Sequence, residues 1–116
     1  MPAFSFAAPI LPGKTDAWRA AIAELDGPRR EAYLASRAAL GITYEQATLQ
    51  STPDGDLAVV HFVADDPDVL GGMMMGTSDF DKWFREAVLV GIHGFDLAGP
   101  PPPPVEVVFE NILPHD

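Results

Sequence analysis

The chain has 116 residues, of which 17 are acidic and 7 are lysine or arginine, so its formal net charge at pH 7 is −10. This balance argues against nucleic acid and anionic membrane surfaces as partners, because both recruit clusters of basic side chains. The absence of cysteine excludes disulfide scaffolds, thiolate zinc sites and cysteine nucleophiles.

The length predicts a single domain over residues 1–116, and the 47% of hydrophobic residues is enough to build a packed core. No stretch combines a basic head with the apolar run of a signal peptide. No apolar stretch approaches the roughly 18 residues of a membrane span. We therefore expect a cytoplasmic protein without membrane association.

Residues 3–10 alternate loosely and predict a first strand. Apolar side chains then recur at helical spacing, which predicts a helix with Thr15 as its N-cap and Gly27 just beyond its end. Pro28 suits the first turn of a second helix, which Gly41 ends. The two helices should form a pair that bends at Gly27 and Pro28.

A β-hairpin is predicted in the middle of the chain. Residues 42–50 are rich in β-branched and aromatic side chains, and residues 57–64 form the most apolar segment. The residues between them have turn chemistry, with Gly55 free to adopt a positive φ. The two segments should therefore pair as antiparallel strands.

Two helices are predicted after the hairpin. Residues 69–76 favour only a weak helix, because three glycines interrupt them. Ser78 begins the clearest helix of the chain, with Asp81 in the place of the usual capping-box Glu. Its apolar stripe predicts a helix of about 14 residues docked on a sheet. Leu89 and Val90 lie off the stripe, which suggests a second apolar contact such as a subunit interface. The stripe consists of Phe80, Trp83, Phe84, Ala87, Val88, Gly91 and Ile92.

The prolines at residues 100–104 are expected to form a stiff spacer before a last strand at residues 105–110. The order strand, helical pair, strand, strand, helix, strand predicts an α+β fold, the ferredoxin-like split βαβ sandwich. Helices on one side of such a sheet leave its other face open, and alternation along residues 57–64 makes that face apolar in either register. Because an exposed apolar face needs a partner, we expect a homodimer joined through it.

Short motifs stand at the junctions of these elements. They are the Pro-Gly-Lys turn at residues 12–14, GPRR at 27–30, Gly-Ile at 41–42, Gly-Asp at 55–56, FDKWFRE at 80–86 and HGFD at 93–96. With the order of the elements, they make the chain resemble the dimeric α+β-barrel superfamily, in which two ferredoxin-like subunits pack sheet against sheet. GPRR, FDKWFRE and HGFD more narrowly resemble a family of small uncharacterised proteins.

The resemblance implies a fold and the place of a cavity, not one reaction. The superfamily includes cofactor-free monooxygenases of polyketide-like aromatics, haem-degrading proteins, dehydratases, muconolactone isomerases and simple stress-responsive proteins. Their cavities lie between the sheet and its own helices. The resemblance therefore implies a pocket in the same place here.

Two histidines and one glutamate are the candidate catalytic residues. His61, in the middle of a strand, faces either the helix-side cavity or the dimer face. His93 follows the amphipathic helix and is either an acid–base group or an imidazolium favoured by the C-terminal end of that helix. Glu45 would hold the tautomer of His61 if the hairpin placed the two side by side. These residues predict no metal site, and we expect no cofactor.

The candidate pocket residues are mostly aromatic. They are Trp18, Tyr44, Met74, Trp83 and Phe84. Such rings pack as core, and they also line cavities that bind aromatic molecules. Met74, beside glycines, would be either core filling or a pliable lid. Tyr44 and Glu45 point to opposite faces of their strand, so only one of them can face a given cavity.

Arg29, Arg30 and Arg37 form the densest basic cluster. We expect them on a solvated helix face that offsets nearby acids, with a clamp for a ligand carboxylate as the alternative.

The sequence leaves two functions open. The first is a small dimeric protein with an apolar ligand pocket between sheet and helices. The second is a cofactor-independent oxygenase or isomerase that acts on an aromatic or polyketide-like small molecule. The expected partners are a second copy of the chain and an apolar small molecule.

Overall fold

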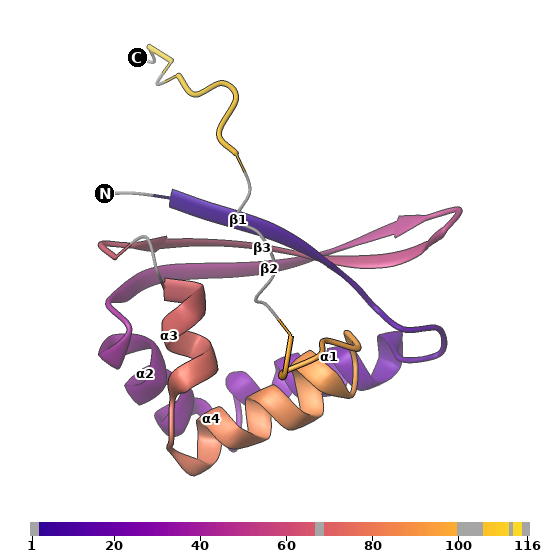
Figure 1. The fold of residues 1–116 in the computed structure, drawn as a ribbon. Coiled ribbons are helices and arrows are strands. Elements are labelled where there is room, and N and C mark those ends of the chain that lie inside the picture. Colours follow the sequence, from indigo (N-terminus) through magenta and orange to yellow (C-terminus); the bar gives the residue numbers. More distant parts are fainter. Residues whose placement is uncertain (1–2, 67–68, 100–105, 112, 115–116) are drawn as a thin grey trace.

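The computed structural model describes residues 3–66, 69–99, 106–111 and 113–114. It has two layers, a three-stranded antiparallel sheet and a group of helices under one face of that sheet (Figure 1). The protein is therefore an α+β structure, as the sequence predicts. The elements are β1 (Ala3–Pro9), α1 (Thr15–Leu25), α2 (Arg30–Ala39), β2 (Ile42–Thr52), β3 (Gly55–Ala64), α3 (Val69–Met75), α4 (Asp79–Trp83) and the π-helix η1 (Phe84–Val90).

The strand order is β1-β3-β2, so β3 lies in the centre and pairs antiparallel with both neighbours. The predicted hairpin of β2 and β3 is confirmed, and Gly55 in its turn has a φ of +129°, where only glycine is unstrained. Phe6 of β1 and Ala47 of β2 lie opposite Val60 of β3. Because side chains alternate along a strand, these three share one face, and it is the face that the helices cover.

The core fills the space between this inner face and the helices. One buried cluster consists of Ile10, Trp18, Ala21, Ala58, Val88 and Ile92. A second cluster, under the other end of the sheet, consists of Phe62, Ala64 and Val69. Phe62 is 1% exposed, and its ring lies 5.8 Å from that of Phe4. Two apolar clusters therefore hold the sheet to the helices.

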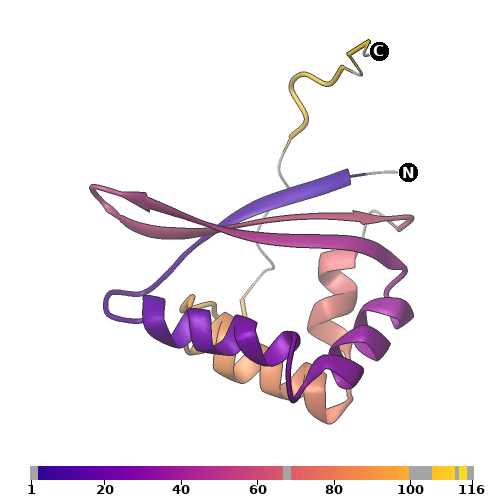
Figure 2. The ribbon, with the colours of Figure 1, turned by 180° about the vertical axis from the view of Figure 1, so that it is seen from behind.

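The outer face of the sheet carries no helix in the part of the chain that the structure describes (Figure 2). Val59, His61 and Val63 of β3 point to this face, with Ser5 of β1 and Tyr44 of β2 beside them. Ser5 Oγ and His61 Nδ1 are 2.9 Å apart, and the rings of Tyr44 and His61 are 6.3 Å apart. The outer face is therefore a mixed surface with an apolar central strand.

The predicted helical pair is present as α1 and α2, but Thr15 does not cap α1. Lys14 is the N-cap residue and makes no side-chain capping bond, whereas Thr15 is the first helical residue. The Thr15 hydroxyl donates to Asp56 Oδ2 at 2.6 Å, and this bond lowers the pKa of Asp56. Thr15 therefore ties the helix to the hairpin. None of the helices that the structure describes is both long and apolar enough to span a membrane.

The predicted cap of α4 is confirmed. Ser78 Oγ accepts a hydrogen bond from the Asp81 backbone N–H at 3.1 Å and donates one to Asp81 Oδ2 at 2.8 Å. This reciprocal contact caps the first turn of α4, where the apolar stripe begins.

The end of this helix differs from the prediction because it winds as a π-helix. The backbone N–H groups of Gly91 and His93 donate to the carbonyls five residues earlier. The wider turns bring Leu89 and His93 to the buried side, where each is 7% exposed. The predicted contact of Leu89 with another subunit is therefore wrong, since Leu89 packs inside its own subunit. Val90 remains 39% exposed.

The fourth strand predicted at residues 105–110 is absent over residues 106–110. Residue 105 and the predicted proline spacer lie outside the described residues. The β-branched composition favours a strand, but a strand forms only where a neighbour satisfies its backbone groups. This segment instead extends away from the helices, on the outer side of the sheet (Figure 1). Val108 and Phe109 are 86% and 83% exposed there.

Candidate functional site

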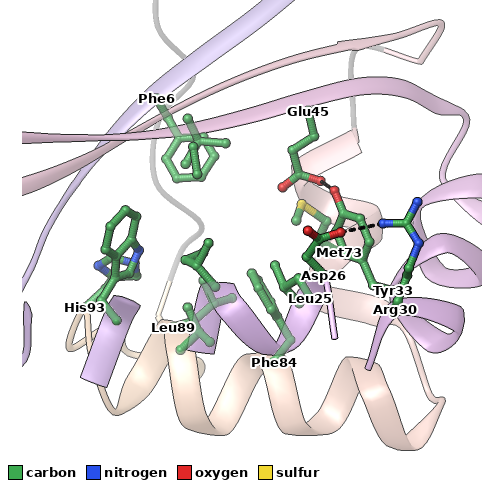
Figure 3. Close-up of a pocket in the computed structure, with 15 residues that line it drawn as sticks. Phe6, Leu25, Asp26, Arg30, Tyr33, Glu45, Met73, Phe84, Leu89 and His93 are labelled. Atoms are coloured by element: carbon green, nitrogen blue, oxygen red, sulfur yellow. Dashed lines mark hydrogen bonds and ion pairs between the residues drawn. The ribbon is translucent and has the colours of Figure 1, made fainter. Parts of the chain in front are cut away.

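A cavity of about 240 Å³ lies between the inner face of the sheet and the helices (Figure 3). Its walls are mainly apolar, and a few polar groups converge on it. The apolar lining consists of Phe6, Trp18, Ile22, Leu25, Ala47, Val60, Met73, Phe84, Val88 and Leu89. The polar lining consists of Asp26, Arg30, Tyr33, Glu45 and His93. This combination is typical of a small-molecule site.

Glu45 of β2 forms the polar end of the cavity. Its Oε1 accepts hydrogen bonds from the Tyr33 hydroxyl and from Arg37 Nε, each at 2.8 Å. Burial and the Glu45 carboxylate raise the pKa of Tyr33 to about 12. The phenol is therefore a hydrogen-bond donor throughout the physiological pH range, and α2 holds one oxygen of Glu45 from two sides.

Arg37 lies behind this end of the cavity and is 5% exposed. Its guanidinium carbon lies 5.0 Å from the ring centre of Tyr33 and 4.9 Å from that of Phe84. A buried cation against aromatic faces, with a carboxylate at one edge, is well compensated. Among the described residues, however, Arg37 Nη2 is the one covered side-chain polar atom without a hydrogen-bond partner.

A polar network connects Arg37 to the cap of α4. Arg37 Nη1 lies 3.4 Å from Ser36 Oγ, and the Ser36 hydroxyl donates to Asp81 Oδ1 at 2.7 Å. Burial alone would raise the pKa of Asp81, but the hydrogen bonds from Ser36 and Ser78 outweigh it and lower this pKa. The network therefore fixes α2 against the start of α4 and, through Arg37, against Glu45.

His93 lies at the other end of the cavity, just beyond η1. Its Nδ1 is 2.9 Å from the Pro9 carbonyl oxygen. Because a carbonyl can only accept, Nδ1 carries the proton and Nε2 carries the lone pair. Burial lowers the pKa of His93 below its usual 6.5, although the bond to Pro9 acts in the opposite direction. His93 is therefore a neutral imidazole at pH 7, not the charged helix cap that the sequence leaves open.

Asp26 and Arg30 form an ion pair where the cavity meets solvent. Arg30 Nη1 lies 2.6 Å from Asp26 Oδ1, and the two side chains are 57% and 84% exposed. Figure 3 shows this pair beside Tyr33, on the same side of the cavity as Glu45 and far from His93. A molecule that entered here would pass two charges that neutralise each other.

The hairpin register separates the predicted catalytic residues. Glu45 lies opposite Phe62 and Gln46 lies opposite His61, so Glu45 and His61 point to opposite faces. The predicted Glu45–His61 pair is therefore not formed, and His61 faces the outer side with Ser5. The structure instead places Glu45 and His93 in one cavity.

Only some of the predicted pocket residues line the cavity. Trp18 and Phe84 line the cavity, but Tyr44 is 49% exposed on the outer face. Trp83 points to the junction of α1 and η1, where the Arg29 guanidinium lies 3.9 Å from its ring centre. Met74 lies outside the cavity, and its neighbour Met73 lines it instead.

Sequence reasoning missed Tyr33 as a site residue; it offered Arg37 as part of a clamp for a ligand carboxylate but did not foresee Arg37 as the buried partner of Glu45. The spacing of four residues between Tyr33 and Arg37 places both on one face of a helix, and Tyr33 is a natural anchor for a buried face. Arg37 was expected in solvent because arginine usually is, and only the partner on β2 makes its burial possible.

Within the described ranges, no three histidine, aspartate or glutamate side chains gather closely enough to hold a metal ion. Comparison of the chain with models of known protein families, with curated proteins and with solved structures found no match.

Proposed function

We propose that this protein binds a small, largely apolar molecule in the cavity between its sheet and its helices. The observation that carries the proposal is the cavity itself, with apolar walls, a fixed carboxylate at one end and a neutral imidazole at the other. An apolar cavity of about 150 Å³ is large enough to bind benzene. The present volume of about 240 Å³ therefore suits a ligand of one or two fused rings.

A binding experiment with naphthalene tests this proposal. Ala47→Phe would place a ring in the cavity from its β2 wall, because Ala47 lines the cavity and its side chain faces open space. We expect naphthalene to bind the native protein and to lose at least tenfold in affinity in this variant. Ala38→Phe is the matched control, since Ala38 is exposed on α2 outside the cavity. Equal binding to both variants, or none to the native protein, would overturn the proposal.

The proposed assembly is a homodimer of ferredoxin-like subunits joined through the outer sheet faces. The order β1-β3-β2 is compatible with such a sheet, whose fourth strand would lie along the free edge of β1. Residues 106–110 have the composition for that strand and expose Val108 and Phe109. A second copy that covers the outer face would also cover these side chains.

Light scattering tests the assembly. We expect twice the 12.4 kDa of the chain, and we expect Val59→Lys, at the centre of the outer face, to give the monomer. Ala38→Lys, on the exposed side of α2, serves as the control for an added charge. A native protein that scatters as a monomer would contradict the dimer and leave the binding proposal standing.

The alternative function is a cofactor-independent isomerase or oxygenase, and the tautomer of His93 favours it. A neutral imidazole with a free Nε2 can take a proton from a bound substrate and return it at another atom, which is the net change of an isomerisation. An oxygenase would need molecular oxygen as well. Mass spectrometry and NMR of 2-naphthol after incubation with the protein in air separate the functions, because a binding protein returns this probe unchanged.

A further inference from the structure

Some polar groups at the cavity already bond to neighbouring residues, and others are left to bind a ligand. The Tyr33 hydroxyl and Arg37 Nε already donate to Glu45 Oε1. Among the described residues, Glu45 Oε2 receives no hydrogen bond, and Figure 3 shows one carboxylate oxygen turned away from Tyr33, toward the side of the cavity where Phe6 lies. This end therefore offers an acceptor.

The His93 end offers an acceptor as well. Nδ1 donates to the Pro9 carbonyl, so the lone pair is on Nε2, and no described residue donates to it. Arg37 Nη2 is the one atom in the described ranges that is both covered and unpartnered. Glu45 Oε2 and His93 Nε2 also lack a hydrogen-bond partner among the described residues, but neither atom is covered. Both acceptors are therefore accessible to a water-sized group.

The charges at the cavity compensate each other. Arg37 is paired with Glu45, and Arg30 is paired with Asp26. No described residue of the lining is a cation without a carboxylate partner. An anionic ligand would therefore meet the Glu45 carboxylate without a free positive charge to offset the repulsion. Arg37 Nη2 does not compensate, because it is covered and Arg37 is not part of the cavity lining.

The two acceptors stand apart, with an apolar space between them. Figure 3 shows Glu45 at one side of the cavity and His93 at the other, with Phe6 above this space and Leu89 and Phe84 below it. A flat apolar body would fill this space, and hydrogen-bond donors at its two ends would meet the two acceptors.

We propose that the ligand is an uncharged, ring-sized molecule with a hydroxyl group at each end, one donating to Glu45 Oε2 and the other to His93 Nε2. This inference rests on the proposed binding function and goes further, because it states the charge and polarity of the ligand. Two acceptors select donors, since an unpaired acceptor covered by an apolar ligand loses its hydration.

A series of probes of one size tests the inference at about pH 7.5, where aromatic hydroxyl groups are uncharged. Ligand-observed NMR titration gives the dissociation constants of naphthalene, 2-naphthol, 2,6-naphthalenediol and 2-naphthoate. We expect 2-naphthol to bind about tenfold more tightly than naphthalene, and the diol several-fold more tightly again. The carboxylate should bind no more tightly than naphthalene.

The outcomes separate the two proposals. If no probe binds, the binding function itself fails. If naphthalene binds and the diol gains nothing, the function stands and the inference is overturned. If 2-naphthoate binds most tightly, the inference is also overturned, and Arg37 Nη2 becomes the group that recognises an anion.

A pair of variants assigns the second donor contact. His93→Met removes the acceptor and keeps an apolar side chain, so the advantage of the diol over 2-naphthol should vanish while 2-naphthol keeps its advantage over naphthalene. Val90→Met is the matched control on the exposed side of η1 and should retain the whole series. A diol advantage that survives His93→Met would refute the assignment of His93. The probe series with the native protein remains decisive if His93→Met does not fold.

Discussion

The two faces of the sheet carry similar residue types, but they differ in what surrounds them. The inner face packs Phe62 against the helices and presents Glu45 to the cavity. The outer face presents His61 and Tyr44, the groups that would otherwise be natural partners of Glu45 in acid–base chemistry. One strand register thus decides which polar groups share a cavity, and composition does not.

The two faces also place one histidine each in different surroundings. His61 lies 2.9 Å from the Ser5 hydroxyl on a face that carries no helix among the described residues, whereas His93 is 7% exposed and bonded to a backbone carbonyl. Of the two, His93 is the one that lines the cavity between the sheet and the helices. Enclosure between two layers is therefore what makes the inner face the candidate site.

The largest expected contrast is between aromatic residues on the two faces. Phe62→Ala should lower the free energy of unfolding by about 3–5 kcal/mol, because it opens a cavity in the core. Tyr44→Ala, on the neighbouring strand but pointing outward, should cost about 1 kcal/mol or less. Chemical denaturation at a protein concentration low enough to keep the chain monomeric measures both. Equal losses would mean that the outer face is packed as tightly as the inner one.

The next contrast is between a buried and an exposed ion pair. Arg37→Met should destabilise the fold by about 3 kcal/mol, because it leaves the mostly buried Glu45 carboxylate without its cation. The Arg37 and Glu45 side chains are 6% and 13% exposed. Arg30→Met removes one partner of the mostly exposed pair with Asp26 and should cost under about 1 kcal/mol.

The double variant Arg37→Met with Glu45→Leu checks the reason for this loss. It should regain much of the stability, because both charges leave the interior together. A double variant no more stable than Arg37→Met would show that the contacts of Arg37 with the rings of Tyr33 and Phe84 matter more than its charge.

Local sequence patterns predict the elements of this fold well. The positions of α1 and the hairpin follow from helical periodicity, turn residues and β-branched segments, although Thr15 begins α1 instead of capping it and both strands are two residues longer than predicted. The π-helical winding of η1 has no comparable signature, because its residues also suit an ordinary helix. At residues 106–110 the sequence pattern predicts a strand that is not formed, because the pattern does not supply a neighbouring strand to pair with.

The candidate site could be predicted only in part. Glu45 and His93 stand out by residue type, yet their common location depends on the hairpin register and on η1. Arg37 shows the limit most clearly. A charged residue on a helix is ordinarily solvated, and its burial becomes intelligible only when Glu45 is known to lie 2.8 Å away on another element.

The smallest expected effect is a pH dependence that belongs to the inner face. Burial lowers the pKa of His93, so the unfolded chain binds a proton here more readily than the folded one. The stability that depends on the neutral imidazole is therefore complete above the unfolded pKa of about 6.5 and is lost as the pH falls toward the lower folded value. Acid pH changes more than one group of a protein, so a direct comparison between two variants is needed to isolate His93.

His93→Gln provides that comparison, because an amide can donate to the Pro9 carbonyl but does not titrate. Thermal unfolding between about pH 7.5 and pH 5 should show a smaller decrease in Tm for His93→Gln than for the native protein, because all other groups are the same in both. Equal decreases in Tm for the two proteins would mean that the folded chain binds a proton at His93 as readily as the unfolded chain does. Below the unfolded pKa of about 6.5 the cavity would then have a cation at the end where an acceptor is needed, and at such a pH a ligand could not donate to Nε2.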